Sequence, residues 1–420
     1  MIEPARVQAA IEILDQVAAS LSNDGPAADV LIRKYFRTRR YAGSKDRRSV
    51  TAMVYQVIRN WGFLSEVSAG DMRRMMMLSL SSAEHFTGLD HAPAETTEEE
   101  VAFLAAPHAK EAHHEQNYPV WLTDRLRSRF PENFVAELDS LNGRAPFDLR
   151  VNLGKATLVE VETFLKSEEI DYSKGKWADA ALVLSDNLRI DAWELYKGGQ
   201  VEIQDEAAQL AVQISDIKPG QQVMDLCAGA GGKTLAAAAY MENKGQIYAF
   251  DNNFNRMKDL KPRAKRANVR ILQGRHVDTA GGKRDKILSE YTNCMDRVIL
   301  DVPCSGSGVW RRNPELKWRL DEDKLQQYCK IQKNLLTEGW GFVKPGGRMI
   351  YMTCSLFDDE NEKQVTDFLS GQGDAKLVPY AESYNRTDLK TLSSIPECLA
   401  LSPYSHGTDG FFVAILEKTT

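Results

Sequence analysis

The spacing of apolar residues divides the chain into a helical first part, a short mixed part and a long part in which strands and helices alternate. In residues 5–21 and 47–64, apolar residues recur every three or four positions, which predicts amphipathic helices. Residues 70–115, with three consecutive methionines and a run of acids, lack this period and are predicted to be irregular. A small α+β module follows. Its predicted elements are helices at 119–130 and 157–167 and strands at 147–153 and 181–185.

From about residue 204 the pattern alternates regularly. The predicted strands are 221–227, 247–251, 269–274, 296–302 and 348–354, and the helices are 203–215, 232–241, 255–267 and 323–343. This order predicts an α/β fold with a doubly wound, Rossmann-like parallel sheet. A further strand at 409–418 is expected at the edge of the sheet. The predicted regions are a helical domain (1–70), a linker or insertion (71–115), the α+β module (116–203) and the sheet domain (204–420).

Length and composition agree with several soluble domains. A chain of 420 residues with 43% hydrophobic and 27% charged residues is too long for one ordinary core. No apolar run reaches the roughly 18–20 residues of a membrane span, and the N-terminus does not resemble a signal peptide. Six cysteines without a C-x-x-C pair favour neither a metal site nor a disulfide framework. We expect a cytoplasmic monomer with no metal and no membrane partner.

The charge is unevenly distributed. The whole chain carries −6, but from Asn253 to Arg348 there are 21 lysines and arginines against 11 acids, a balance of +10. A second basic run, Arg33 to Arg48, has eight cations and one acid, interleaved with aromatic residues. Either run alone could be a solvated face. Two such regions in an acidic protein favour a polyanionic partner.

The distinctive side chains of the sheet domain follow the predicted strands. In open α/β sheets, ligands bind beyond the carboxyl ends of the strands, where the strand order reverses. The residues at these ends are Cys227, Asp251, Asp278, Asp301, Cys304 and Cys354. The first three are expected to line a cofactor that contains a nucleoside. Asp301 with two loop cysteines suggests a nucleophile, a partner thiol and a group that reads or protonates a base.

The glycine-rich stretch DLCAGAGGKT, residues 225–234, is neither of the two common phosphate-binding loops. A P-loop requires glycine where Cys227 stands, and a G-x-G-x-x-G motif requires glycine where Thr234 stands. A nicotinamide-dependent dehydrogenase would explain this turn and Asp251, but it would leave both cysteines without a role.

Three stretches together resemble a known family. DLCAGAGGKT, DVPCSGSGVWRRNPELKWR and KPGGRMIYMTCS are similar to the Sun-type RNA cytosine-5 methyltransferases, related to the bacterial 16S ribosomal RNA methyltransferase B. The resemblance is best over 200–420. It implies a class I methyltransferase fold, and VYQVIRN near the N-terminus resembles the NusB-like RNA-binding domain of several members. The family usually reads C-A-A-P-G-G-K, whereas Gly229 and Ala230 stand here in place of alanine and proline.

The resemblance implies S-adenosylmethionine as the cofactor. The residues it assigns to cofactor binding are Cys227, Ala228, Gly229, Ala230, Gly231, Gly232, Lys233, Asp251, Asp278 and Asp301. Asp251 would bind the ribose hydroxyls and Asp278 the adenine side, while Lys233 would hold the loop or the cofactor.

The resemblance also implies a mechanism on RNA, with ribosomal RNA as the expected substrate. Cys354 would add to carbon-6 of cytosine, Asp301 would hydrogen-bond the ring edge at nitrogen-3, and Cys304 would help release the product. The base must first leave its stack. The cations expected to grip phosphates are Arg311, Arg312, Lys317 and Arg319. Two alternatives stay open: transfer RNA as the target, and a non-catalytic assembly factor that retains the fold.

Overall fold

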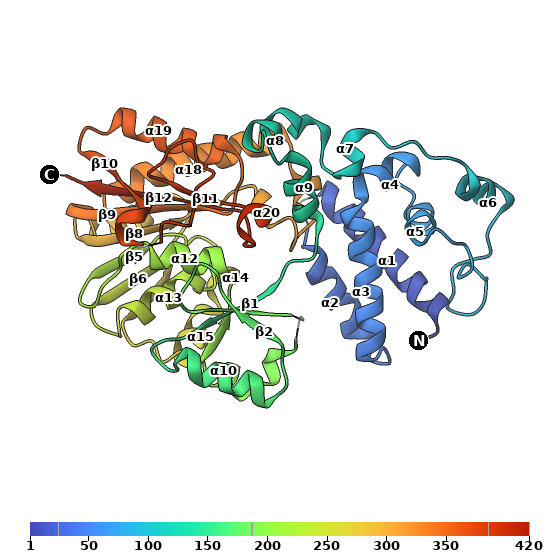
Figure 1. Ribbon diagram of the computed structural model, residues 1–420, viewed down its shortest axis with the longest axis horizontal. Helices are drawn as coiled ribbons and strands as arrows, with labels where there is room; N and C mark the ends of the chain where they lie inside the picture. The colour runs from blue at the N-terminus through green and yellow to red at the C-terminus, as the bar shows by residue number, and fades with distance from the viewer. Residues whose placement is uncertain (24, 186–187, 385, 420) are drawn as a thin grey trace. The chain divides into compact units, whose positions relative to one another are not determined.

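The computed structural model describes residues 1–23, 25–185, 188–384 and 386–419. The chain forms two compact units, which we call the helical unit (1–143 and 309–322) and the sheet unit (144–308 and 323–420). The division at 143/144 falls inside the module predicted for 116–203: the helix predicted at 119–130 belongs to the helical unit, whereas the helix predicted at 157–167 and both predicted strands belong to the sheet unit. Helices and strands carry the labels of Figure 1.

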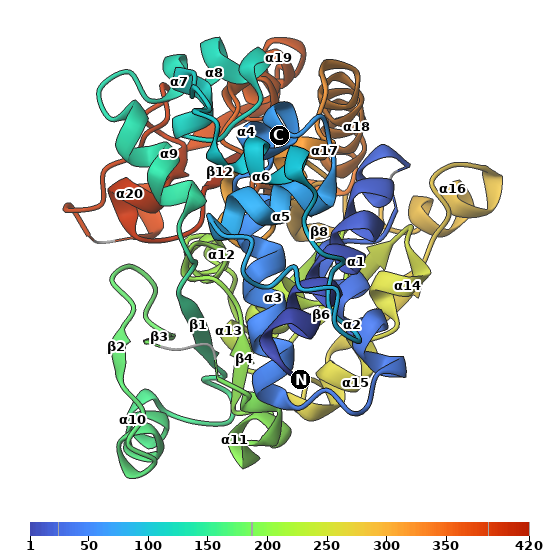
Figure 2. The same ribbon diagram turned by 90° about the vertical axis from the view of Figure 1, so that its right-hand side faces the viewer.

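The helical unit is built around one apolar core. Its helices are α1 (Glu3–Ser22), α2 (Ala28–Thr38), α3 (Ser44–Arg59), α4 (Trp61–Val67), α5 (Met72–Leu80), α6 (Glu98–Ala105), α7 (Ala112–Glu115), α8 (Thr123–Arg129), α9 (Phe134–Asn142) and α17 (Leu316–Arg319). Figure 2 shows α1, α2, α3 and α5 in blue. Ile13 of α1 and Val54 of α3 are fully buried in this core, as their helical spacing predicts.

The prediction of irregular structure over 70–115 was wrong for three segments, which form α5, α6 and α7. Asp71 caps α5 by accepting hydrogen bonds from the backbone N–H groups of Arg73 and Arg74. Met75, Met76 and Met77 are all fully buried. Three consecutive buried residues produce no helical period, because they face the core on more than one side of the helix.

The sheet unit contains a small antiparallel sheet and a large mixed one. The small sheet has the order β2-β3-β1-β4. Its strands are β1 (Phe147–Val151), β2 (Tyr172–Lys174), β3 (Ala181–Leu184) and β4 (Val201–Ile203), accompanied by α10 (Leu158–Ser167) and α11 (Glu194–Lys197). Leu149, Leu165 and Leu182 lie in its core with no exposed surface.

The large sheet has the order β10-β12-β9-β8-β5-β6-β7, with β11 paired to β12. Its strands are β5 (Gln222–Asp225), β6 (Gln246–Asp251), β7 (Leu272–His276), β8 (Met295–Asp301), β9 (Val343–Thr353), β10 (Ala375–Val378), β11 (Leu399–Leu401) and β12 (Phe411–Lys418). Strands β7, β6, β5, β8 and β9 run parallel, and the order reverses between β5 and β8. The predicted doubly wound sheet is confirmed.

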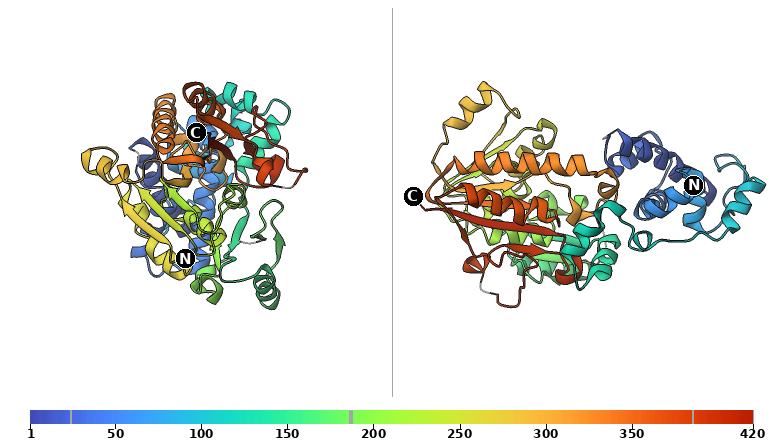
Figure 3. Two further views of the ribbon diagram at one scale, coloured as in Figure 1. Left: turned by 90° about the vertical axis from the view of Figure 1, so that its left-hand side faces the viewer. Right: turned by 90° about the horizontal axis from the view of Figure 1, so that it is seen from above.

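Helices cover both faces of the large sheet (Figure 1). They are α12 (Glu206–Gln213), α13 (Gly232–Tyr240), α14 (Phe254–Met257), α15 (Leu260–Arg266), α16 (Gly282–Ser289), α18 (Glu322–Trp340), α19 (Glu362–Gly371) and α20 (Pro403–His406). Successive residues of β5 point to opposite faces: Val223 packs with Leu210 of α12, and Met224 with Leu336 of α18. Figure 3 (right) shows α18 as the long orange helix. Among the described residues, no helix combines the length and hydropathy needed to cross a membrane.

Two predictions about the sheet domain need correction. The last strand, β12, lies between β9 and β10 and is antiparallel to both, so it is not an edge strand. Its core segment is buried on both faces, which explains its continuous apolar run. The helix predicted over 255–267 is divided into α14 and α15, with Pro262 in the first turn of the second helix.

Candidate active site

The turn after β5 requires glycine at two positions. Gly229 and Gly231 have φ values of +52° and +86°, in the left-handed region that favours glycine. A Cβ atom on Gly231 would also lie 2.3 Å from Leu260 Cδ1. Helix α13 begins immediately after this turn, at Gly232. The turn and the N-terminus of α13 therefore present backbone N–H groups at the switch point, where an anionic or polar ligand can approach closely.

Asp251, at the end of β6, organises the neighbouring backbone. Its Oδ2 accepts from the N–H of Gly229 at 2.8 Å and its Oδ1 from the N–H of Asn253 at 2.7 Å. Its own carbonyl accepts from Val277 N–H at 3.0 Å, which brings the exposed Asp278 to the same edge of the sheet. Each carboxylate oxygen keeps a second lone pair for a ligand hydroxyl. The structure thus brings the glycine turn (residues 227–232), Asp251 and Asp278 together.

Two arginines that the sequence analysis did not single out donate to carbonyl groups of the glycine turn. Arg263 of α15 donates to Ala230 O at 2.8 Å, and Arg150 of β1 donates to Gly232 O at 2.7 Å. Arg263 also forms an ion pair with the buried Glu202 of β4, at 2.9 Å. The turn lacks the family's proline at Ala230, and these contacts restrain it from outside. The sequence signal that could have found Arg150 is a charged residue in the middle of the apolar strand predicted at 147–153, because a buried charge needs a partner.

Two side chains at the end of β5, Asp225 and Cys227, have pKa values raised above their usual range. Asp225 is 1% exposed, and burial raises its pKa to about 7, although the hydroxyl of Thr234 donates to it at 2.6 Å. Burial also raises the pKa of the Cys227 thiol, and repulsion from Asp225, Asp301 and Asp251 adds to this. Cys227 is therefore held as a thiol and is not a candidate nucleophile.

Asp225→Asn should change how stability depends on pH. In the unfolded chain Asp225 titrates near 3.8, but in the folded protein near 7, so the folded state binds the proton more tightly. Its contribution is fully present below pH 3.8 and is lost as pH rises to about 7, by on the order of 4 kcal/mol. Denaturant titrations should show the variant gaining stability relative to the parent protein from pH 4 to 7 and no further change above 7.

Asp296→Asn is the matched control for this titration. Burial raises the pKa of Asp296, but hydrogen bonds from Gln222 N–H and Lys344 outweigh burial and lower it. This variant should therefore lose stability relative to the parent as pH rises through about 4. Parallel pH profiles for the two variants would contradict the assignment of Asp225.

Lys233 and Asp301 form an ion pair across the switch point. Lys233 Nζ lies 2.7 Å from Asp301 Oδ2, with side-chain exposures of 13% and 33%. Burial alone would lower the pKa of Lys233, but attraction to Asp301 and the hydrogen bond between them outweigh it and raise that pKa. The ammonium group also lies 5.1 Å from the centre of the Phe411 ring. Lys233 is therefore a fixed cation that orients the half-buried Asp301 carboxylate.

The two predicted site cysteines are in contact. Cys304 and Cys354 follow the neighbouring parallel strands β8 and β9, and their sulfur atoms are 3.3 Å apart. The hydrogen bond with Cys354, together with burial, raises the pKa of Cys304 well above its usual value. Cys304 is therefore held as a thiol in contact with Cys354. Both cysteines are partly exposed, so a ligand can reach them.

The four cations predicted to grip phosphates have a different environment from the one expected. Lys317 is 1% exposed within the helical unit, and its ammonium donates to Asn117 O at 2.9 Å and to the Asn142 side chain. Burial, with repulsion from Arg59, lowers the pKa of Lys317 to about 7. A phosphate role for Lys317 is therefore wrong for this structure.

The neighbouring arginines also pack inside the helical unit. Arg319 donates to Gly25 O at 2.7 Å and to Pro26 O at 2.9 Å, and Arg311 is 5% exposed. Arg312 is half-buried, and it is the member of the group for which phosphate contact stays a prediction. Residues 309–322 thus pack inside the helical unit. Their sequence alone does not distinguish such a packed segment from an exposed basic surface.

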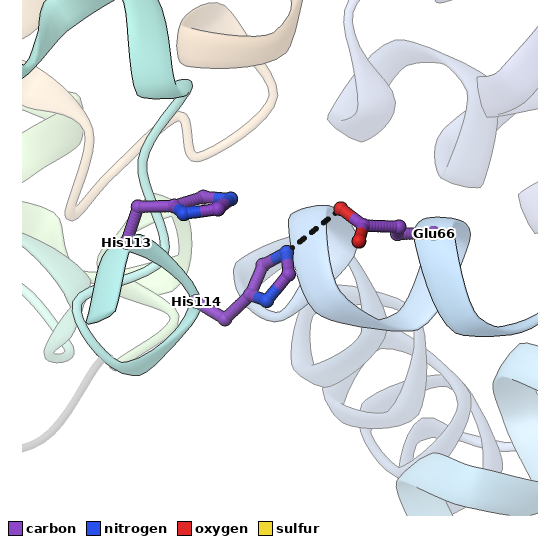
Figure 4. Close-up of side chains that lie close together, drawn as sticks. All are labelled: Glu66, His113 and His114. Carbon is purple, nitrogen blue, oxygen red and sulfur yellow. Dashed lines mark hydrogen bonds and ion pairs between the residues drawn. The ribbon is translucent and has the colours of Figure 1, made fainter. Parts of the chain in front are cut away.

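Three side chains of types that bind metals converge in the helical unit: Glu66, His113 and His114 (Figure 4). The backbone N–H of Glu111 donates to His114 Nδ1 at 3.3 Å. This tautomer places the proton on Nε2, which then donates to Glu66 Oε2 at 3.0 Å. No lone pair of His114 faces the other two residues, and we assign the group to the packing of α7 on α4.

The fold and the turn at the switch point together define a class I methyltransferase. The chain belongs to the RsmB/F family of 16S rRNA methyltransferases, whose profile matches residues 212–417. The ferredoxin-like domain of RsmF/B-like methyltransferases matches residues 118–191. The predicted resemblance is thereby confirmed.

Individual relatives agree with the family profile. Ribosomal RNA small subunit methyltransferase B of Pectobacterium atrosepticum is 34% identical over 74% of this chain and 68% of its own length. The matched region spans about two thirds, 66–68%, of such relatives. The crystal structure of PH0851 superposes with a TM-score of 0.81 at 27% identity, covering 100% of this chain and 99% of that one. A methyltransferase homolog protein from Pyrococcus horikoshii gives 0.63 at 26% identity, covering 73% and 97%.

Proposed function

We propose that this protein transfers a methyl group from S-adenosylmethionine to carbon-5 of a cytosine in small-subunit ribosomal RNA, through a covalent bond to Cys354. The observation that carries the proposal is the pair of sulfur atoms 3.3 Å apart beside the Lys233–Asp301 ion pair. A dehydrogenase would need neither thiol. A non-catalytic assembly factor would have no use for a thiol pair and a carboxylate held together at the switch point.

The residues around the turn fit the cofactor. A Cβ atom on Gly229 would face open space, so a ligand can approach the backbone closely there. Each carboxylate oxygen of Asp251 accepts one backbone N–H and keeps a lone pair for a ribose hydroxyl. Asp278 is exposed at the next strand end, on the adenine side. When bound there, S-adenosylmethionine supplies an electrophilic methyl group.

Methylation of cytosine at carbon-5 requires activation of the ring, and we assign this to Cys354, Asp301 and Cys304. Carbon-5 of cytosine is a weak nucleophile, and addition of the Cys354 sulfur to carbon-6 turns the ring into an enamine that can accept a methyl group. The Cys354 thiol loses its proton as the sulfur adds to carbon-6, and nitrogen-3 gains a proton, so the ring becomes a neutral enamine. The Asp301 carboxylate, oriented by Lys233, would accept a hydrogen bond from this nitrogen-3 N–H group. Cys304 is held as a thiol, so it does not compete as the nucleophile. We propose that it acts in the later step, in which the carbon-5 proton leaves and the Cys354 bond breaks.

The substrate proposal rests on the family and on charge. Relatives are named as small-subunit ribosomal RNA methyltransferases, and residues 253–348 carry a balance of +10. We also propose that the helical unit binds RNA, because the basic run from Arg33 to Arg48 keeps exposed cations such as Arg37 and Arg48.

Two linked measurements test the function. Calorimetry should show that S-adenosylmethionine binds without RNA, and Asp251→Ala should weaken this binding by about 1–3 kcal/mol because a charge-assisted hydrogen bond is lost. Asp259→Ala, at an exposed acid between α14 and α15, is the matched control and should bind normally.

With labelled cofactor and 16S ribosomal RNA, digestion should yield labelled 5-methylcytidine. Binding of a nicotinamide dinucleotide instead, or label on another base, would contradict the proposed function. Label found only in transfer RNA would show that transfer RNA is the substrate instead of ribosomal RNA.

A further inference from the structure

A fully buried carboxyl group that the proposed mechanism does not use joins the two cysteine loops. Glu360 lies in the short 3-10 turn after β9 and has no exposed surface. Its Oε1 accepts from the backbone N–H of Ser305 at 2.8 Å, and its Oε2 accepts from the Ser305 hydroxyl at 2.5 Å and from the Ser355 hydroxyl. Ser305 and Ser355 are the residues that directly follow the two cysteines. One carboxyl group therefore holds the residue after each sulfur.

Other contacts fix Glu360 itself. Gln332 of α18 donates to Glu360 Oε1 at 2.9 Å and to Pro303 O at 2.9 Å. Tyr351 of β9 donates to the Glu360 carbonyl at 2.6 Å. Asn361, the next residue, donates to Ser355 O at 2.9 Å. The carboxyl group is thus rigidly placed between the strand ends.

Burial of the Glu360 carboxyl group costs free energy of folding, so stability alone does not explain this residue. Burial raises the pKa of Glu360, against the hydrogen bonds from Ser305, Ser355 and Gln332 that lower it. An apolar side chain of similar size often serves stability as well as a buried charged or polar group does. Both carboxyl oxygens and the carbonyl oxygen of Glu360 accept hydrogen bonds, however, and such a network fixes geometry. This favours a geometric role for Glu360.

We propose that Glu360 is a positioning residue that sets the spacing of the Cys304 and Cys354 sulfur atoms by binding the residue that follows each of them. The consequence for catalysis rests on the proposed function: the sulfur that attacks carbon-6 and the thiol that acts in release must reach the same base. The spacing itself does not depend on that function, because it can be measured without RNA or cofactor.

The test measures how readily the two thiols form a disulfide in a glutathione buffer. The thiols of Cys304 and Cys354 lose two electrons and two protons, and one glutathione disulfide gains them to become two glutathione molecules. Peptide mapping by mass spectrometry quantifies the 304–354 bond, and the equilibrium gives the effective concentration of one thiol toward the other. Glu360→Ala should lower it about tenfold or more, because a misplacement of about 1 Å between held groups can cost on the order of 10²-fold.

Three further variants make the result specific. Glu360→Gln keeps the shape and a carbonyl acceptor, and the serine hydroxyls can rotate to accept from its amide, so it should stay within about threefold of the parent. Ser355→Ala removes the link between Glu360 and one loop, together with the contacts of this hydroxyl to Ser305, Ser307 and Phe357 N–H. It should also lower the effective concentration, and it provides a second test if Glu360→Ala does not fold. Glu206→Ala removes another buried carboxyl, which accepts from Trp177 and Ala178 N–H, and should leave the thiols unchanged.

Two outcomes would overturn the positioning role. One is an unchanged effective concentration in both Glu360→Ala and Ser355→Ala; the other is an equal loss in Glu206→Ala. In methylation assays, Glu360→Ala should lose turnover while its affinity for S-adenosylmethionine stays within about twofold, since the glycine turn does not contact Glu360. A parent protein that methylates no cytosine, yet shows the predicted thiol result, would refute the proposed function and leave the positioning role intact.

Discussion

Cys354→Ala is expected to stop methylation and to form no covalent complex with RNA, whereas Cys304→Ala is expected to methylate once and remain bound. The reason is the placement of the two sulfurs at 3.3 Å on neighbouring strand ends, with Cys304 held as the thiol. Without the Cys354 sulfur the ring cannot be activated, so turnover should fall by about 10⁴-fold or more, as when other enzymes lose a nucleophile. Without Cys304, attack and transfer remain possible but release is slow.

The measurement is a denaturing gel of protein mixed with RNA and S-adenosylmethionine. Cys304→Ala should give a slowly migrating band that requires the cofactor and disappears in the double variant. Cys294→Ala, which removes an exposed cysteine outside the site, is the matched control and should behave like the parent. A trapped band in Cys354→Ala with none in Cys304→Ala would reverse the two roles. Full activity in both single variants would exclude a two-thiol mechanism.

Lys233→Met and Asp301→Asn are each expected to lower turnover by about 10²- to 10⁴-fold, the range typical of a lost proton-transfer or charge-stabilising group. Their ion pair at 2.7 Å is mostly shielded from water, so it is worth more than an exposed pair. Asparagine keeps the shape of Asp301 but cannot carry the charge that stabilises a proton at nitrogen-3. Methionine keeps the length of Lys233 but leaves Asp301 without its cation.

Because the two residues act as one unit, the double variant should lose little more than either single variant. Single-turnover rates and RNA affinities measured separately would show that the loss lies in the chemical step, with RNA binding changed by less than about threefold. Lys244→Met breaks an exposed ion pair with Glu242 and is the control that should have no effect. Fully additive losses would mean that Lys233 acts on something other than Asp301.

The sequence alone was sufficient to locate most of the site, because the relevant information is local. Alternating strands and helices predict parallel strands, and parallel strands bring their carboxyl ends to one edge. Any residue directly after such a strand must therefore lie near the others. That is why Asp251, Cys304 and Cys354 could be expected at one place, although 50 residues separate the two cysteines.

Only the tertiary structure decided which partners and which burial each of these side chains has. Lys233 was expected to hold the loop or the cofactor, but it pairs with Asp301, 68 residues away along the chain. Lys317 has the same local signature as a phosphate-binding cation, yet it is buried among residues of the helical unit. Glu360 lies in an acidic run that looks solvated in the sequence, yet it is fully buried.

The physical reason is the range of the interactions. Period, turn chemistry and strand order are set by neighbours within a few residues, and they determined the sheet, the glycine turn and the strand-end residues of this protein. Burial, ion pairing and pKa depend on groups that are distant in the chain, and the pattern around a residue does not encode them. The sequence thus determined where the site lies, and the tertiary structure decided which of its charged groups remain available for chemistry.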